Sequence, residues 1–180
     1  MLLPVEVRED LTWWITLLLT FNRTKFFNDA SRASFYLFTD ASRLGIGGFF
    51  YAGGSSNWKE NIQLTSRENS YSMAIPQSEL TLPLDINVFK VQAVGQVIRR
   101  WGRRWSGQHV FIHTDNSATF YGIRKGSLAS LANRHLRLLL CEAAQMDIKL
   151  TPLWLAGATN ELADALSRFR FKIIANECLY

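Results

Sequence analysis

Two patterns of hydrophobic residues recur along the chain. Short apolar runs rich in β-branched and aromatic residues predict strands, and apolar residues three and four positions apart predict helices. Strands are expected at residues 35–39, 44–51, 58–64, 110–114 and 148–155, with a polar loop over 65–84. Helices are expected at residues 9–20, from 85 or 87 to about 101, 116–123, 128–146 and after Asn160. This order predicts an α/β domain with a mixed five-stranded sheet and helices packed against it.

The same spacing predicts which helix faces are buried. The buried faces are expected to carry Val91, Val94, Val97 and Ile98 in one helix, and Leu131, Leu138, Leu139 and Ala143 in another. In the N-terminal helix, an apolar stripe of Leu11, Trp14, Ile15 and Leu18 is expected to pack on the domain.

The apolar run from Leu11 to Phe21 invites a membrane interpretation, which its length does not support. A bilayer span needs about 20 apolar residues. A signal peptide would begin with a basic segment, whereas MLLPVEVRED is net acidic. We therefore expect a packed helix and no membrane association.

Composition fits one domain with a short appendage. The chain has 180 residues, 48% of them hydrophobic, which is enough for a sizeable core. We divide it into an N-terminal helical segment (1–30), a domain (31–172) and a C-terminal tail (173–180). The net charge of +5 is compatible with a polyanionic partner. Two cysteines, Cys141 and Cys178, are more typical of reduced thiols than of a disulfide, so we expect an intracellular protein.

Three aspartates stand at positions where ligand sites collect. Asp40 and Asp115 each end a predicted strand, and Asp164 lies in the first turn of the last helix. Taken singly, each is more simply a turn or helix-start residue. Brought together, carboxylates repel one another unless a cation intervenes, which points to hard ions such as Mg²⁺. Two such ions about 4 Å apart can hydrolyse a phosphodiester.

The sequence motifs around these residues resemble those of a known family. FTDAS, DINVFKVQAV, IHTDNSAT and NELADALSR occur in this order, and EDLTWWITLLLTFN precedes them. Together they resemble the ribonuclease H domain of reverse transcriptases, especially that of fungal retroelements of the DIRS and related tyrosine-recombinase type. The likeness spans roughly residues 6 to 170. It implies a ribonuclease H-like fold that cleaves the RNA strand of RNA·DNA hybrids with Mg²⁺ or Mn²⁺. It also implies contact with a polymerase domain through the N-terminal segment.

The resemblance makes Asp40, Asp115 and Asp164 three of the family's four metal-binding acids, but the fourth has changed. Lys90 stands where the family has a glutamate, and the flanking DINVF and QAV fix the alignment. Unit charges about 4 Å apart interact by roughly 4 kcal/mol at an effective dielectric of 20. A charge change of two units is therefore expected to weaken divalent-ion binding by orders of magnitude.

Neighbouring residues offer no obvious replacement for the missing glutamate. Asp85 and Gln92 lie about 140° and 200° around the helix from Lys90, at roughly 100° per residue. Glu68 and Glu79 belong to the predicted loop and would help only if it folds inward. Alternatively, the ammonium of Lys90 itself occupies the cation site.

Basic residues provide candidate contacts to nucleic acid. Arginines surround Trp101 and Trp105, which suits phosphate binding and base stacking, although a solvated helix end with buried tryptophans is an equally good interpretation. The candidate nucleic-acid contacts are Arg99, Arg100, Arg103, Arg104, Asn116, Arg124, Lys125 and Asn160. His109, His113 and His135 are expected to be structural or surface residues, since the loop 154–159 before the last helix contains no histidine.

Two principal hypotheses follow. The first is an endoribonuclease acting on RNA·DNA hybrids, impaired by Lys90. The second is a catalytically degenerate ribonuclease H fold that binds a hybrid, another nucleic acid or a protein. A tether within a larger polyprotein is a weaker third. Metal-dependent cleavage separates the first from the others, and salt-sensitive hybrid binding without cleavage separates the second from the third.

Overall fold

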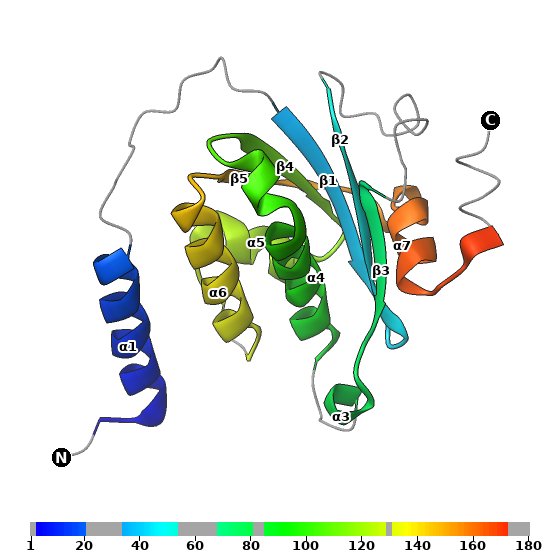
Figure 1. Ribbon diagram of the computed structural model, residues 1–180. Helices are drawn as coiled ribbons and strands as arrows, with labels where there is room; N and C mark the ends of the chain where they lie inside the picture. The colour runs from blue at the N-terminus through cyan, green and yellow to red at the C-terminus, as the bar shows by residue number, and fades with distance from the viewer. Residues whose placement is uncertain (1–2, 21–33, 54–67, 81–84, 129–130, 173–180) are drawn as a thin grey trace. The chain divides into compact units, whose positions relative to one another are not determined.

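The computed structural model describes residues 3–20, 34–53, 68–80, 85–128 and 131–172 (Figure 1). The chain divides into two units, residues 1–31 and 32–180.

The first unit contains one helix, α1 (Val5–Thr20), which begins four residues before the predicted helix. Among the described residues of this unit, none covers the predicted apolar stripe. Leu11, Trp14, Ile15 and Leu18 have exposed fractions of 48% to 64%. The packing of this stripe on the second unit stays a prediction. No helix among the described residues has the length and apolar character needed to span a membrane.

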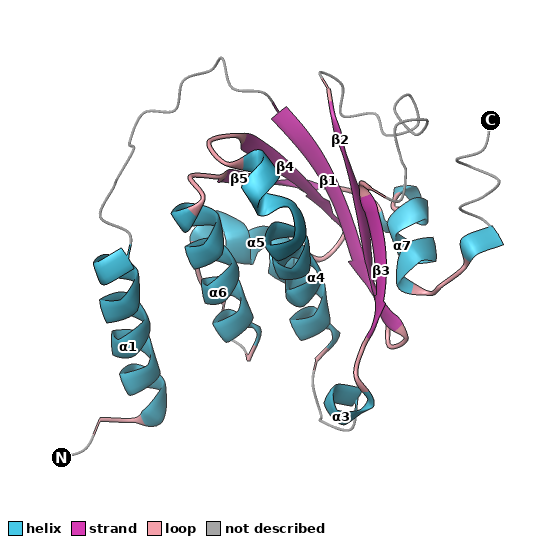
Figure 2. Cartoon of the chain, viewed as in Figure 1, coloured by secondary structure: helices cyan, strands magenta, loops and turns pink. Residues whose placement is uncertain are grey.

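The second unit is built on a mixed five-stranded sheet (Figures 1 and 2). Its strands are β1 (Ser34–Ala41), β2 (Gly45–Ala52), β3 (Ser70–Ala74), β4 (His109–Thr114) and β5 (Lys149–Trp154). They lie in the order β3-β2-β1-β4-β5. The hairpin β1–β2 and the pair β2–β3 are antiparallel, whereas β4 is parallel to both β1 and β5. The predicted mixed five-stranded sheet with flanking helices is thus confirmed.

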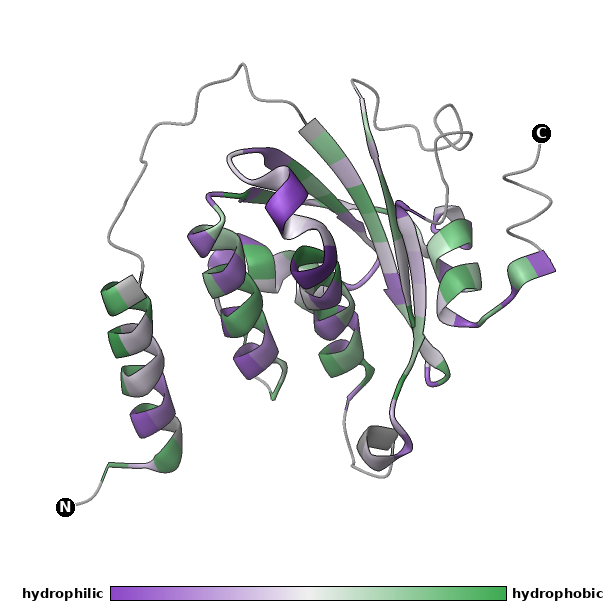
Figure 3. Ribbon diagram, in the orientation of Figure 1, coloured by the Kyte–Doolittle hydropathy of each residue, from purple (hydrophilic) through white to green (hydrophobic). Residues whose placement is uncertain are grey.

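Three helices cover one face of the sheet: α4 (Ile86–Trp101), α5 (Ser117–Lys125) and α6 (Ala132–Gln145). The spacing of apolar residues in α4 explains this packing. Val91, Val94, Val97 and Ile98 are all fully buried, as predicted. They pack in one core cluster with Leu37 of β1 and residues of α6. Figure 3 shows the hydrophobic residues of these helices and of the strands.

The opposite face carries α7 (Glu161–Ser167), whose Leu162 and Leu166 pack on Phe38 and other aromatic residues of the sheet. Helix and sheet approach very closely here. A Cβ added at Gly47 in β2 would lie 2.5 Å from the Cβ of Leu166 and from the backbone nitrogen of Ser167. A glycine is therefore needed where α7 crosses β2. The remaining short elements are α3 (Gln77–Leu80), η2 (Gly102–Trp105) and η3 (Gly157–Thr159).

Two sequence predictions were wrong. The third strand, β3, lies at Ser70–Ala74 inside the segment predicted as a loop, while residues 58–64, the predicted strand, lie outside the described residues. In α6, Leu139 and Ala143 are buried as predicted, but Leu131 and Leu138 are 73% and 41% exposed. Leu131 precedes the helix proper, which begins four residues later than predicted.

Candidate functional site

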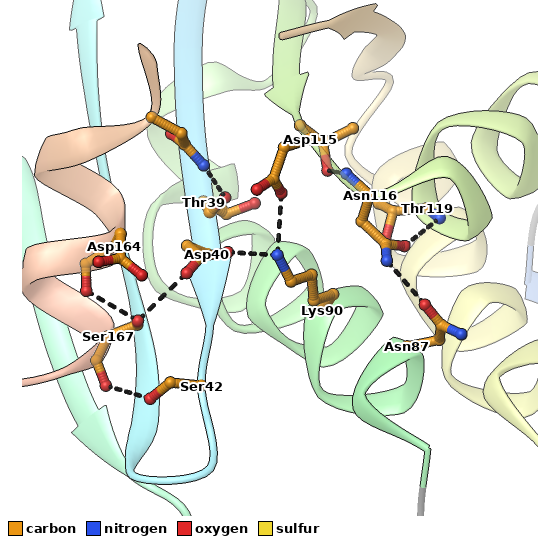
Figure 4. Close-up of polar contacts among 12 residues, drawn as sticks. Thr39, Asp40, Ser42, Asn87, Lys90, Asp115, Asn116, Thr119, Asp164 and Ser167 are labelled. Carbon is orange, nitrogen blue, oxygen red and sulfur yellow. Dashed lines mark hydrogen bonds and ion pairs between the residues drawn. The ribbon is translucent and has the colours of Figure 1, made fainter. Parts of the chain in front are cut away.

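The site lies at the edge of the sheet where β1 and β4 end. These strands are parallel neighbours, and Phe38 of β1 is in register with His113 of β4. Asp40 and Asp115 each lie two residues beyond this pair, so both carboxylates emerge at the same edge (Figure 4). Asp40 is still within β1, and its side chain is 4% exposed. Asp115 lies between β4 and α5.

Lys90 joins these two carboxylates. It is the fifth residue of α4, and its side chain is 17% exposed. Its Nζ donates to Oδ1 of Asp40 at 2.6 Å and to Oδ1 of Asp115 at 2.9 Å (Figure 4). One ammonium thus binds two carboxylates, one within β1 and one directly after β4.

Burial and ion pairing act together on these groups. Burial raises the pKa of Asp40, and the hydrogen bond and charge of Lys90 offset part of that rise. Burial lowers the pKa of Lys90, but its bonds to Asp40 and Asp115 outweigh burial and leave this pKa above its ordinary value. Lys90 is therefore a cation at neutral pH, since the ordinary lysine pKa is already about 10.4.

Asp164, the third predicted acid, is held separately. It lies on α7, and its Oδ1 accepts a 2.6 Å hydrogen bond from Nε of Arg168, one helical turn onward. Its link to Asp40 is indirect. The hydroxyl of Ser167 lies 3.2 Å from Oδ2 of Asp40 and 2.9 Å from the backbone oxygen of Asp164, and its single hydrogen serves one at a time.

Amide side chains fix the surroundings of the three acids. Asn116 caps α5 by accepting from the backbone nitrogen of Thr119, and its Nδ2 donates to Asn87 of α4 at 2.7 Å. The N-termini of α4 and α5 are thereby joined beside Asp115. Asn160 directly precedes α7, but its side chain makes no capping hydrogen bond to that helix; it is 2% exposed, and its Nδ2 donates to the carbonyl of Thr39.

Comparison with known proteins identifies the fold. Neither a protein-family model nor a curated protein matches the sequence. An N-terminal RNase H domain from Mycobacterium tuberculosis, solved as a fusion with maltose binding protein, matches with a TM-score of 0.54 and 12% identity, covering 76% of this chain and 97% of that chain. RNase H1 from Halobacterium salinarum NRC-1 matches with a TM-score of 0.53 and 12% identity, covering 79% and 99%. The fold is ribonuclease H-like.

The acids of this ribonuclease H-like fold do not fit a divalent cation as they stand. Two of them already ligate the ammonium of Lys90, and the third is paired with Arg168. Among the described residues, no group of three or more His, Cys, Asp or Glu side chains has an arrangement that could hold a metal ion. The ammonium uses Oδ1 of both Asp40 and Asp115, and its positive charge repels a divalent cation that approaches the remaining carboxylate oxygens.

The basic residues lie elsewhere on the ribonuclease H-like fold. Ten residues of helix, or about 15 Å, separate Lys90 from Arg100. Trp101 and Trp105 are 3% and 0% exposed, so these rings belong to the core and do not offer stacking surfaces. Arg103 and Arg104 of η2 are exposed.

The other four basic candidates, Arg99, Arg100, Arg124 and Lys125, differ in their surroundings. Arg99 is bonded to Glu142 at 2.8 Å, and the guanidinium of Arg100 lies 5.5 Å from the centroid of the Trp101 ring. Arg124 and Lys125 are exposed in the last turn of α5.

Sequence reasoning missed Ser167, Arg168 and Asn87. A signal existed for Arg168, because an acidic and a basic residue four positions apart on a helix commonly pair. Ser167 gave no signal, since its contact with Asp40 depends on how α7 packs on the sheet. Asn87 shares its helix with Lys90, but its partner Asn116 is remote in sequence.

Proposed function

We propose that this chain is a ribonuclease H domain of the retroelement reverse transcriptase type, impaired in cleaving the RNA strand of RNA·DNA hybrids. Three observations support this proposal: the ribonuclease H-like fold, the aspartates at the sheet edge, and the sequence motifs around them that resemble the family. The observation that carries the impairment is the double ion pair from Lys90 to Asp40 and Asp115. It places an ammonium among the acids that the family uses for metal binding.

The charge arrangement explains why cleavage should be weak. Each ion pair lies at hydrogen-bond distance and is partly removed from water, so a metal ion competes with a cation that cannot diffuse away. Displacing the ammonium also leaves it without carboxylate partners in a site where it is mostly buried. We therefore expect the chain to bind Mg²⁺ or Mn²⁺ poorly.

A second candidate function is binding without cleavage. In this version the ribonuclease H-like fold is catalytically degenerate and holds a hybrid, another nucleic acid or a protein. Arg103, Arg104, Arg124 and Lys125 favour the nucleic-acid form, because their exposed cations can reach phosphate oxygens. Such binding would weaken steeply with salt.

The N-terminal segment is proposed to contact a polymerase domain. Its support is the exposed apolar stripe of α1, formed by Leu11, Trp14, Ile15 and Leu18. Exposed apolar patches of this kind commonly mark protein interaction sites.

Cleavage of a labelled RNA·DNA hybrid tests the proposal. The natural chain should cleave slowly or not at all with Mg²⁺ or Mn²⁺, whereas Lys90→Glu should cleave at least about tenfold faster. A tenfold gain corresponds to about 1.4 kcal/mol, well within the roughly 4 kcal/mol expected for one removed charge pair. Asp115→Asn added to Lys90→Glu should abolish the gain, which excludes a contaminating nuclease.

Hybrid binding by the same proteins separates the two candidates. Rapid metal-dependent cleavage by the natural chain would overturn the impairment. A folded Lys90→Glu variant that binds hybrid and metal but stays inactive would favour the binding module. A natural chain that neither cleaves nor binds nucleic acid would contradict both.

A further inference from the structure

The position of Lys90 suggests a role beyond the loss of cleavage. Its stem belongs to α4, while its two partners end β1 and precede α5. The bonds to Asp40 and Asp115 therefore connect a helix to two neighbouring strands of the sheet (Figure 4). A metal ion bound by the same acids would make connections of the same kind.

The negative charges of Asp40 and Asp115 need a cation nearby, because the two carboxylates lie close together. Both emerge at one edge of parallel neighbouring strands, and Asp40 is almost completely buried. Two carboxylates this close repel each other, and water screens a buried group only weakly. In this chain the cation is covalently part of the protein, so one of the two negative charges is compensated in the absence of any ion.

We infer that Lys90 is an internal substitute for a metal ion, which makes the folded domain independent of divalent cations. The ammonium offers three donors, of which two are used on the two carboxylates. It holds the end of β1, the start of α5 and the second turn of α4 together. On α7, Arg168 compensates Asp164 in the same way, although that pair is more exposed. This inference concerns folding stability and holds whether or not the chain binds a hybrid.

Loss of the ammonium should have the opposite effect on metal binding. If the ammonium is removed and the carboxylates remain, they lose their counter-charge and become available as ligands. Lys90→Met is the suitable change, because methionine keeps much of the stem while removing the charge. The variant should be less stable without metal, and it should gain stability when a divalent ion binds.

Thermal unfolding of the natural chain and of Lys90→Met tests this, with EDTA and with millimolar Mg²⁺ or Mn²⁺. The midpoint of the natural chain should be the same in all conditions. Lys90→Met should melt roughly 5 to 10 °C lower in EDTA, given the cost of leaving buried charges unpaired, and Mn²⁺ should recover several degrees.

Two further variants serve as controls. Lys172→Met makes the same chemical change at an exposed lysine and should behave like the natural chain. Lys90→Met with Asp40→Asn should not respond to metal, because one carboxylate has been removed.

Three results would overturn the inference. One is a natural chain whose midpoint rises with Mg²⁺ or Mn²⁺. Another is a Lys90→Met variant as stable as the natural chain and indifferent to metal. The third is an equal metal response in the double variant, which would place the ion elsewhere. If Lys90→Met folds only when metal is present, the inference is supported, and if it never folds, the first result still decides.

Discussion

Acid should destabilise the domain through His113, which is buried on the face of the sheet that carries α7. The residue is 6% exposed, and its ring stacks on Phe38 with centroids 4.2 Å apart and planes 2° apart. Neither ring nitrogen has a hydrogen-bond partner among the described residues. Burial lowers the pKa of His113 to about 4.

The direction and size of the effect follow from this pKa. An unfolded histidine takes up a proton as the pH falls below about 6.5. In the folded chain His113 stays neutral down to about pH 4, so its contribution to stability is present above pH 6.5 and is lost as the pH falls toward 4. One pKa unit is worth about 1.4 kcal/mol, so the full loss is about 3 kcal/mol. Roughly 2 kcal/mol of it falls between about pH 7 and pH 5.

Urea unfolding of the natural chain and of His113→Phe at these two pH values measures the effect. Phenylalanine keeps a flat ring on Phe38 but does not titrate. The free energy of unfolding of the natural chain should fall more on acidification, by about 2 kcal/mol, because the other titrating groups are shared. An identical pH dependence in both proteins would refute the reasoning. A uniform offset from imperfect packing of the new ring would not affect that comparison.

Two further predictions concern packing and nucleic acid. Gly47→Ala should cost about 1 to 3 kcal/mol in urea unfolding, because its Cβ would overlap Leu166. Gly95→Ala in α4 should be neutral or stabilising, because its Cβ would meet only the Arg99 guanidinium, at an ordinary contact distance of 3.8 Å. Equal effects at the two glycines would contradict the packing argument. The double variant Arg103→Gln, Arg104→Gln should bind hybrid more weakly but keep the same melting temperature. The slope of its log affinity against log salt should fall by about 1 for each phosphate that it no longer binds. An unchanged salt slope would exclude these arginines from the interface.

The sequence predicted most of the fold because most elements have one buried face. The apolar runs that became β1, β2, β4 and β5 stood out, and so did the buried stripe of α4. The strand β3 did not, because SYSMA is an edge strand whose residues are half-buried or exposed. The place of β3 in the sheet is set by its pairing with β2, and the five residues of β3 carry no pattern that predicts this pairing.

The candidate site was likewise predictable from the sequence only in part. The strand-end positions of Asp40 and Asp115, together with the family resemblance that aligned Lys90 with a metal-binding glutamate, predicted that these side chains lie together, and Lys90 is hydrogen-bonded to both aspartates. The spacing of Asp164 and Arg168 permitted their ion pair, but spacing alone does not decide whether the Asp164 side chain pairs with Arg168 or turns toward the other acids. The burial of Trp101 and Trp105 also required the tertiary structure, because tryptophan suits both a core and a stacking surface.

A crystal structure of the natural chain grown with Mn²⁺ tests the central claim most directly, because manganese is located by its anomalous scattering. We predict no manganese between Asp40 and Asp115, with Nζ of Lys90 within hydrogen-bond distance of both carboxylates. A manganese ion ligated by Asp40 and Asp115, with Lys90 turned away, would contradict the claim that the ammonium holds the cation position.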